Sequence, residues 1–309
     1  TGAYAEMEWT PVNRFAIRPG VRYEHSTLMN VDKVAPRLSM ALKTGSYSQA
    51  SVAGGVFYQQ APAFYLLQDW LPGYNTMDMQ MATHYIANWQ WSRDNRTLRL
   101  EGYYKDYQQL ILETAPAGTP FNPNLYRFTA TGITNNGNGY AQGIDLFWRD
   151  KKTFKNTDYW VSYSYIDTRR KYMNYPELAT PTFIANHNLN VVGKYWIDKI
   201  KTSVNATYSY ASGRPYYNPG TTGEPAPAFL SQRTPDYHSL SLTAAYLHSF
   251  GKWFTVFYIS VDNVTRRENI FGYRYAPDGK GSFTMAGPIV PALYRTVFFG
   301  VNMSLSEFS

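Results

Sequence analysis

The chain has 309 residues, of which 17% are charged and 17% aromatic, with 28 Tyr, 8 Trp and no Cys. The missing Cys excludes disulfides, thiolate metal sites and cysteine catalysis, and no apolar run reaches the roughly 18 residues of a membrane helix. The net charge of +7 suits nucleic acid, an anionic surface or an anionic ligand, so the positions of the charges must decide between these partners.

The dominant pattern along the chain is an alternation of apolar and polar residues, which is the period of a half-buried β-strand. We count about 13 such segments, each close to the roughly 9–11 residues that a tilted strand needs to cross a bilayer. In chain order they lie near residues 4–9, 15–24, 36–43, 49–58, 82–91, 98–105, 140–149, 158–167, 187–196, 202–211, 238–247, 253–262 and 294–305.

Charged residues keep to one face of these segments: Glu6, Glu8, Arg18, Arg22, Glu24, Arg37, Lys43, Arg99, Glu101, Lys105, Asp145, Arg149, Lys194 and Asp262. The apolar face carries only Asp106 and Asp167, both at strand ends. A Lys or Arg that faces lipid at the bilayer midplane costs about 2–4 kcal/mol. The segregation therefore predicts an all-β fold, a transmembrane antiparallel β-barrel with lipid outside and a polar lumen. A soluble β-sandwich or propeller is the alternative, but an inter-sheet core offers too little room for so many aromatic side chains.

The connections between the segments alternate in length. Short ones lie near 11–14, 45–47, 93–95, 150–156, 197–200 and 248–252, and long ones near 60–80, 108–138, 168–185, 212–236 and 264–290. This alternation predicts tight periplasmic turns and long extracellular loops. We expect Trp9, Trp91, Trp148 and Trp253 to face lipid beside the short turns as an aromatic girdle, and we interpret the glycine-rich stretch 135–139 as flexible loop.

The first and the last segment both run toward the periplasm, because a short turn follows the first and a long loop precedes the last. Two strands of the same direction cannot close an antiparallel barrel with an even number of strands, and bacterial single-chain barrels have even numbers. We therefore expect at least one further strand, in sequence that precedes Thr1.

Several stretches resemble the C-terminal part of the barrel of TonB-dependent outer-membrane receptors. They are residues 36–39, 98–107, 139–147, 212–216, 262–263 with 269–272, and 294–305. The resemblance covers essentially the whole chain. It implies that residues 1–309 are the C-terminal portion of a single barrel domain in the cell outer membrane of a Gram-negative bacterium, with about 13 of 22 strands. It also implies a plug domain outside these residues, through which the TonB complex acts, and Phe308 would take the place of the family's usual terminal aromatic residue.

No motif in the chain indicates catalysis, a metal or a cofactor. The five histidines, His25, His84, His187, His238 and His248, lack the close spacing of metal ligands and are interpreted as wall or interface residues. No Ser is singled out as the partner of a His, so we predict that the chain is not an enzyme. Basic residues are spread over many strands instead of one patch, which argues against nucleic acid.

The long loops combine aromatic and arginine side chains. Aromatic rings give flat apolar contact at low entropic cost, and Arg gives bidentate contacts to anionic groups. The candidate ligand-binding residues are Tyr65, Trp70, Tyr74, Arg169, Arg170, Tyr172, Arg214, Tyr216, Tyr217, Arg267 and Tyr273, and the same loops contain Tyr126 and Arg127. The other interpretation is loop-to-loop packing, with the arginines bound to lipopolysaccharide phosphates. Lumen charges are expected to pair across strands or to hold a plug.

The predicted function, which follows from the resemblance, is TonB-dependent uptake of a scarce small molecule such as a ferric siderophore or a similar chelate. A passive porin-like or hydrophobic-substrate channel is the first alternative, since it would conduct without TonB and need no plug. A soluble β-rich binding module is the second.

Overall fold

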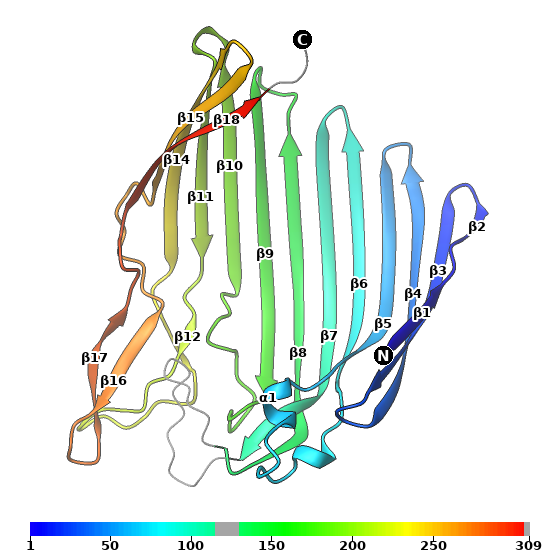
Figure 1. The fold of residues 1–309 in the computed structure, drawn as a ribbon, viewed down its shortest axis with the longest axis vertical. Coiled ribbons are helices and arrows are strands. Elements are labelled where there is room, and N and C mark those ends of the chain that lie inside the picture. The colour runs from blue at the N-terminus through cyan, green and yellow to red at the C-terminus, as the bar shows by residue number, and fades with distance from the viewer. Residues whose placement is uncertain (115–129, 306–309) are drawn as a thin grey trace.

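The computed structural model describes residues 1–114 and 130–305, so that Tyr126, Arg127 and Phe308 lie outside the described residues. Within them the main feature is a 14-stranded antiparallel sheet that curves into a wall (Figure 1). Its strands are β1 (Gly2–Glu6), β2 (Trp9–Val12), β3 (Phe15–Ser26), β4 (Val31–Gly45), β5 (Ser48–Gln59), β6 (Gln80–Arg93), β7 (Arg96–Thr114), β8 (Gly132–Asp150), β9 (Thr157–Lys171), β10 (His187–Ile197), β11 (Thr202–Ala211), β14 (Tyr237–Phe250), β15 (Trp253–Asp262) and β18 (Thr296–Leu305).

The remaining elements lie in the connections. They are the helices α1 (Ala63–Leu66), η1 (Tyr74–Thr76) and η3 (Asp198–Ile200), and the two-stranded sheets β12–β13 (Pro215–Tyr216, Gln232–Arg233) and β16–β17 (Gly272–Pro277, Phe283–Ile289). No helix of the described residues is both long enough and apolar enough to cross a membrane.

The thirteen predicted strands are confirmed as the main path of the sheet, from β1 at one edge to β18 at the other, each paired with the next. The first predicted strand differs in detail, because the structure divides it into β1 and β2. Pro19 of β3 lies opposite the gap and has no N–H to donate, so only Met7 N–H bonds across, to the Pro19 carbonyl at 3.1 Å.

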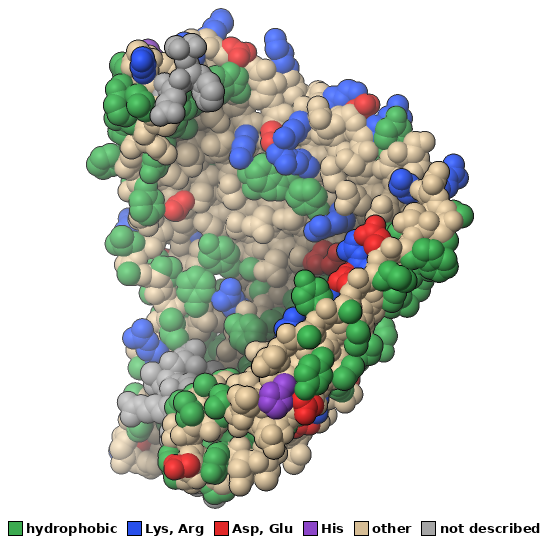
Figure 2. Space-filling view, turned by 45° about the vertical axis from the view of Figure 1, so that its right-hand side comes forward, with side chains coloured by type: hydrophobic (Ala, Val, Ile, Leu, Met, Phe, Trp, Pro, Cys, Tyr) green, Lys and Arg blue, Asp and Glu red, His purple; other side chains and the backbone are tan. Residues whose placement is uncertain are grey.

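The register gives every strand one inward and one outward face, as the alternation predicts. Leu100 pairs with Leu146 on the outward face, and the next pair, Glu101 with Asp145, points inward. When the same alternation is followed from strand to strand through the pairing register, all fourteen charged residues assigned to the polar face lie on the inward side of the wall. Figure 2 shows charged side chains in the hollow of the wall and hydrophobic ones along its outer edge. We call the inward side the luminal face.

The short and long connections gather at opposite ends of the wall, the short turns at the top of Figure 1 and the long loops, with α1, at the bottom. Between β6 and β7, for example, only two residues intervene. Trp91 and Trp148 face outward at the short-turn end, where their rings stack with centroids 6.4 Å apart, and Trp9 and Trp253 are exposed beside other short turns. The positions expected for an aromatic girdle are therefore confirmed.

Two predictions for the connection 108–138 are wrong. Strands β7 and β8 continue far into it, and the stretch 135–139 is part of β8 instead of flexible loop. The glycines allow the backbones of neighbouring strands to approach closely, because a Cβ on Gly137 would lie only 2.6 Å from the Leu110 carbonyl oxygen. Asn135 accepts a hydrogen bond from Asp78 N–H at 2.7 Å and donates one to the Gln109 carbonyl at 2.9 Å. Both contacts fix the strand to its neighbours.

The β8–β9 turn is organised by Asp150, which is 2% exposed. Its carboxylate accepts hydrogen bonds from the N–H groups of Lys152 at 2.7 Å and Thr153 at 2.9 Å, and from the Arg96 guanidinium at 3.1 Å. Burial alone would raise the pKa of Asp150, but the bonds from Thr153 and Lys152 and the charge of Arg96 together hold it well below its usual range.

This turn is therefore expected to be sensitive to acid. A carboxyl group whose pKa is lowered by folding stabilises the fold above the unfolded value of about 3.9, and the stabilisation is lost as the pH falls below it. In Asp150→Asn we expect the amides of residues 151–156 to exchange faster at neutral pH, measured by hydrogen exchange. The gap between variant and wild type should close in acid, and a gap that is independent of pH would contradict this account.

Candidate functional site

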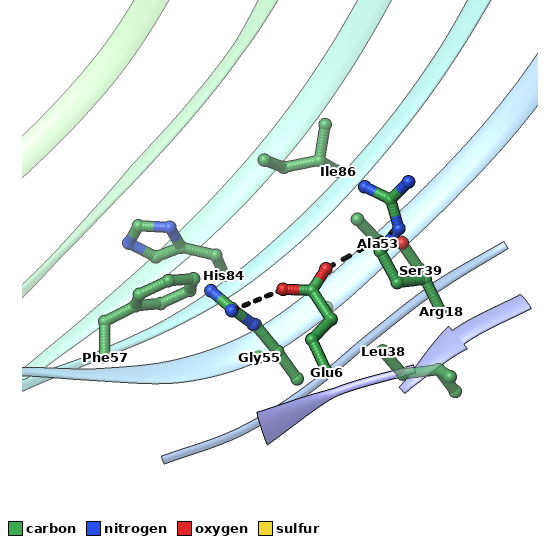
Figure 3. A pocket seen from close by; sticks show the side chains of 11 residues that line it. Glu6, Arg18, Leu38, Ser39, Ala53, Gly55, Phe57, His84 and Ile86 are labelled. Carbon is green, nitrogen blue, oxygen red and sulfur yellow. Dashed lines mark hydrogen bonds and ion pairs between the residues drawn. The ribbon is translucent and has the colours of Figure 1, made fainter. Parts of the chain in front are cut away.

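A pocket of about 120 Å³ opens on the luminal face of β3 to β6. Glu6 accepts a hydrogen bond from Arg37 at 2.6 Å and lies 3.5 Å from Arg18. In Figure 3 the carboxylate of Glu6 is turned toward Arg18, with the rings of Phe57 and His84 on the other side of the pocket. These two rings are in contact, with centroids 4.5 Å apart. The pocket thus combines an apolar wall with a charged rim.

Many luminal charges are paired, as the sequence predicts. Arg18 also binds Glu8, Arg22 binds Glu24 on its own strand, and Arg149 binds Asp158 at 2.6 Å. Lys33 binds Asp78 of the β5–β6 connection at 2.7 Å. These contacts balance charge within the wall and, through Lys33, attach a loop to it.

The β5–β6 connection packs against the loop ends of β7 and β8 in a hydrophobic core, which we call the first loop cluster. It contains the buried residues Ala61, Tyr65, Leu66, Leu71, Met77, Ile111, Ala130 and Ile133, with Met29 and Tyr74 packed against them. Tyr65, a predicted ligand-binding residue, is therefore a core residue whose hydroxyl donates to Glu113. Tyr74 lies at the edge of the cluster, and Trp70 is 60% exposed. Of these three predicted residues, Trp70 presents the most surface to a ligand.

A second loop cluster joins the β9–β10 and β11–β14 connections. Its buried residues are Tyr175, Ala179 and Leu230, and Tyr172, Tyr217 and Phe229 pack against them. The ring of Tyr172 lies 4.8 Å from that of Tyr175, whose pKa is raised by burial. The predicted residues Tyr172 and Tyr217 thus lie together, half-buried, on one cluster.

A third group connects the β11–β14 loop with the β16–β17 hairpin. The rings of Tyr216 and Tyr273 are 4.7 Å apart, and the Tyr216 hydroxyl donates to Gln232 at 2.6 Å. The Arg214 guanidinium lies 5.7 Å from the ring of Phe271. Tyr275 of the same hairpin is buried beside these side chains, and burial raises its pKa to about 12. Three predicted residues are thus brought together here.

The remaining predicted arginines lie in different places and are not brought together. Arg169 and Arg170, predicted as loop residues, belong to β9. By the register Arg169 shares the outward face with Tyr140, whereas Arg170 is luminal and lies over the ring of Tyr107 at 4.5 Å. Continuing the alternation of 158–167 by three residues would have revealed this difference. Arg267 is exposed and donates to the Asp236 carbonyl at 3.2 Å.

The described residues contain no group of three or more His, Asp or Glu side chains arranged to hold a metal ion. Histidines pair with neighbours instead, such as His187 with the Tyr163 hydroxyl at 2.8 Å and His238 with that of Tyr208 at 2.7 Å. The predicted ligand-binding residues at the loop end are Arg, Tyr and Trp side chains, suited to contact with anionic and aromatic groups.

Comparison with known proteins identifies the architecture. A family model described as "TonB dependent receptor-like, beta-barrel" matches residues 1–264. A comparison with curated protein sequences gave no match.

Solved structures with similar folds include the outer membrane transporter YddB from Escherichia coli, with a TM-score of 0.71 and 12% identity. They also include the ferric enterobactin receptor PfeA from Pseudomonas aeruginosa, with a TM-score of 0.67 and 13% identity, and the FrpB iron transporter from Neisseria meningitidis, with 0.67 and 12%. Each alignment covers 97% of this chain and 44% of the other, so the chain spans less than half the length of these proteins. At such identities the likeness concerns the fold.

Proposed function

The chain belongs to the family of TonB-dependent receptor β-barrels, and from this we propose that it forms the C-terminal portion of a receptor that imports a scarce small molecule with energy from TonB. The barrel wall lies in the cell outer membrane, with lipid and lipopolysaccharide around it. Further strands and a plug domain outside residues 1–309 would complete the 22-stranded barrel and provide the contact with TonB.

The observation that carries this proposal is the layer of loops at one end of the wall. The two loop clusters have buried hydrophobic cores, which hold tyrosine side chains such as Tyr172 and Tyr217 in place at the loop end of the charged luminal face. Such pre-organisation lowers the entropic cost of binding a ligand. A passive pore would gain nothing from side chains that are held in place for binding a ligand.

We propose a ferric siderophore or a similar chelate as the substrate. Two of the proteins with similar folds are named as a ferric enterobactin receptor and an iron transporter, which supports this class. The candidate residues fit it chemically, because Arg214 and its tyrosine neighbours can contact the oxygen atoms and the flat rings of an anionic chelate.

Growth under iron limitation tests the proposal. The intact receptor is produced in a strain without its own siderophore receptors, and growth is scored on a panel of ferric chelates with and without TonB. We expect growth on at least one chelate, only with TonB. Growth that does not need TonB would instead indicate a passive channel.

Within the same assay, Arg214→Gln should weaken uptake. Loss of one charge-assisted hydrogen bond costs about 1.5–3 kcal/mol, which corresponds to an at least tenfold higher half-saturating concentration of the chelate. The matched control is Arg14→Gln in an exposed short turn, for which we expect wild-type uptake. Unchanged uptake by Arg214→Gln would remove this arginine from the site.

A further inference from the structure

The long connections of the wall are linked to one another in series. The first loop cluster includes Ile111 of β7, so the β5–β6 connection packs on the loop end of that strand. The second loop cluster joins the β9–β10 and β11–β14 connections. The β11–β14 connection in turn contacts the β16–β17 hairpin, where the Thr222 hydroxyl donates to Asp278 at 2.7 Å and the rings of Tyr216 and Tyr273 are in contact. The link between the first two clusters therefore decides whether the loops act separately or together.

Met173 forms this link. Strand β6 pairs with β7 only as far as Gln108, and Met173 lies along the edge of β7 beyond that point, in a parallel bridge with Leu112. Its N–H donates to the Ile111 carbonyl at 2.6 Å, and its carbonyl accepts from the Glu113 N–H at 2.7 Å. Among the described residues these are the only backbone hydrogen bonds between β7 and the β9–β10 connection.

The neighbours of Met173 belong to both clusters. Ile111 is buried in the first loop cluster, and Glu113 accepts a hydrogen bond from the Tyr65 hydroxyl of the same cluster. On the other side, Tyr172 directly precedes Met173 in the chain and packs against the second loop cluster. A displacement of Met173 would therefore reach both hydrophobic cores.

The backbone of Met173 has a conformation that bulky residues disfavour. Its φ is 49°, in the left-handed region where the side chain crowds the backbone. It is the second residue of a turn that the Tyr175 N–H closes on the Tyr172 carbonyl at 3.0 Å. A positive φ at this position is typical of type I′ and II′ turns, in which Gly, Asn and Asp predominate. A methionine keeps such a conformation only where its surroundings enforce it, and the two bonds to β7 do so here.

We propose that Met173 couples the two loop clusters, so that the β5–β6, β9–β10 and β11–β14 connections become ordered and open as one unit. The coupling depends on the backbone of residue 173, because its N–H and carbonyl make the contacts with β7. A contact that orders one cluster then lowers the entropic cost of ordering the other. Side chains as distant in the chain as Trp70 and Tyr217 would respond to the same event.

Hydrogen exchange of the intact receptor in detergent tests the coupling, measured by mass spectrometry for residues 60–79, 172–185 and 212–232 separately. Met173→Pro removes the N–H and fixes φ at about −65°, so that both bonds to β7 are lost. We expect exchange roughly tenfold faster in all three segments, the effect of losing two backbone hydrogen bonds from a shared opening step. Met173→Gly allows the same backbone conformation without the crowding, so its exchange should be as slow as in wild type or slower.

Glu177→Pro is the matched control. Glu177 is exposed in the same connection and forms no backbone hydrogen bond with another described residue. This variant should leave residues 60–79 at the wild-type rate of exchange.

Leu71→Ala tests the coupling from the other side, because it disrupts the core of the first loop cluster. By itself it should also speed exchange in residues 172–185 and 212–232. Added to Met173→Pro, it should produce no further change in these two segments, which is the non-additivity expected of coupled sites.

Faster exchange confined to residues 170–179 in Met173→Pro, or equal exchange in Met173→Pro and wild type, would overturn the coupling. So would an effect of Leu71→Ala that is confined to residues 60–79. Heat-modifiable gel mobility confirms that the barrel of each variant is folded, and if Met173→Pro does not fold, the single variant Leu71→Ala decides. No ligand enters the measurement, so its result is independent of the proposed transport function.

Discussion

Replacing Val301 with Arg is expected to abolish most barrel assembly. Val301 lies in the middle of β18, pairs with Phe257 and is 56% exposed on the outward face. In the outer membrane that exposed surface faces hydrocarbon. A guanidinium there costs about 2–4 kcal/mol relative to an apolar residue, which is a large fraction of the roughly 5–15 kcal/mol that stabilises a folded protein.

The neighbouring residue provides the matched control, because Asn302 lies one position along the same strand and pairs with Val256 on the luminal face. Folding into lipid vesicles, measured as the fraction with folded mobility on an unheated gel, should fall strongly for Val301→Arg and little for Asn302→Arg. Equal losses for the two variants would contradict the orientation of the strand.

Leu71→Ala is expected to loosen the β5–β6 connection while the barrel stays folded. Leu71 is fully buried in the first loop cluster, and removal of a buried leucine side chain typically costs about 2–5 kcal/mol. That loss would weaken a small cluster that packs on Ile111 of β7 and Ile133 of β8 and makes few polar contacts with the wall, such as those of Asp78. We expect faster hydrogen exchange and new protease cleavage between residues 60 and 79.

Leu67→Ala is the control, since Leu67 belongs to the same connection but is 69% exposed. It should leave exchange and cleavage as in wild type, and both variants should keep the heat-modifiable mobility of a folded barrel. Cleavage that is equally slow in Leu71→Ala and wild type would show that the cluster does not determine the order of the loop. If the barrel itself unfolded in Leu71→Ala, the loops and the wall would be one cooperative unit.

The strands were predictable because a bilayer imposes a strict rule on each position. Any charge on the outward face is penalised, so residues such as Val301 and Asn302 reveal their orientation by their chemical type alone. The ends of the strands were harder to predict. The break between β1 and β2 illustrates this, because it is caused by the missing N–H of Pro19 in the partner strand β3 and not by residues 4–9 themselves.

The loops could be predicted only in part, because their structure depends on contacts distant in the chain. Asn and Gly in 135–139 locally favour a loop, yet pairing with β7 and β9 makes this stretch a strand. Aromatic type alone could not separate Tyr65, which fills a core, from Trp70, which is exposed. The roles of the ligand-binding candidates remain predictions.

Accessibility of single spin labels tests the central claim of this account most directly, namely that apolar side chains face lipid and charged ones face water. Because the chain has no native Cys, Cys can be introduced at successive positions 297–304 of β18 in vesicles and labelled. We predict strict alternation, with odd positions accessible to oxygen dissolved in the lipid and even positions accessible to a water-soluble nickel chelate. The same accessibility at all positions, or alternation of the opposite phase, would contradict it.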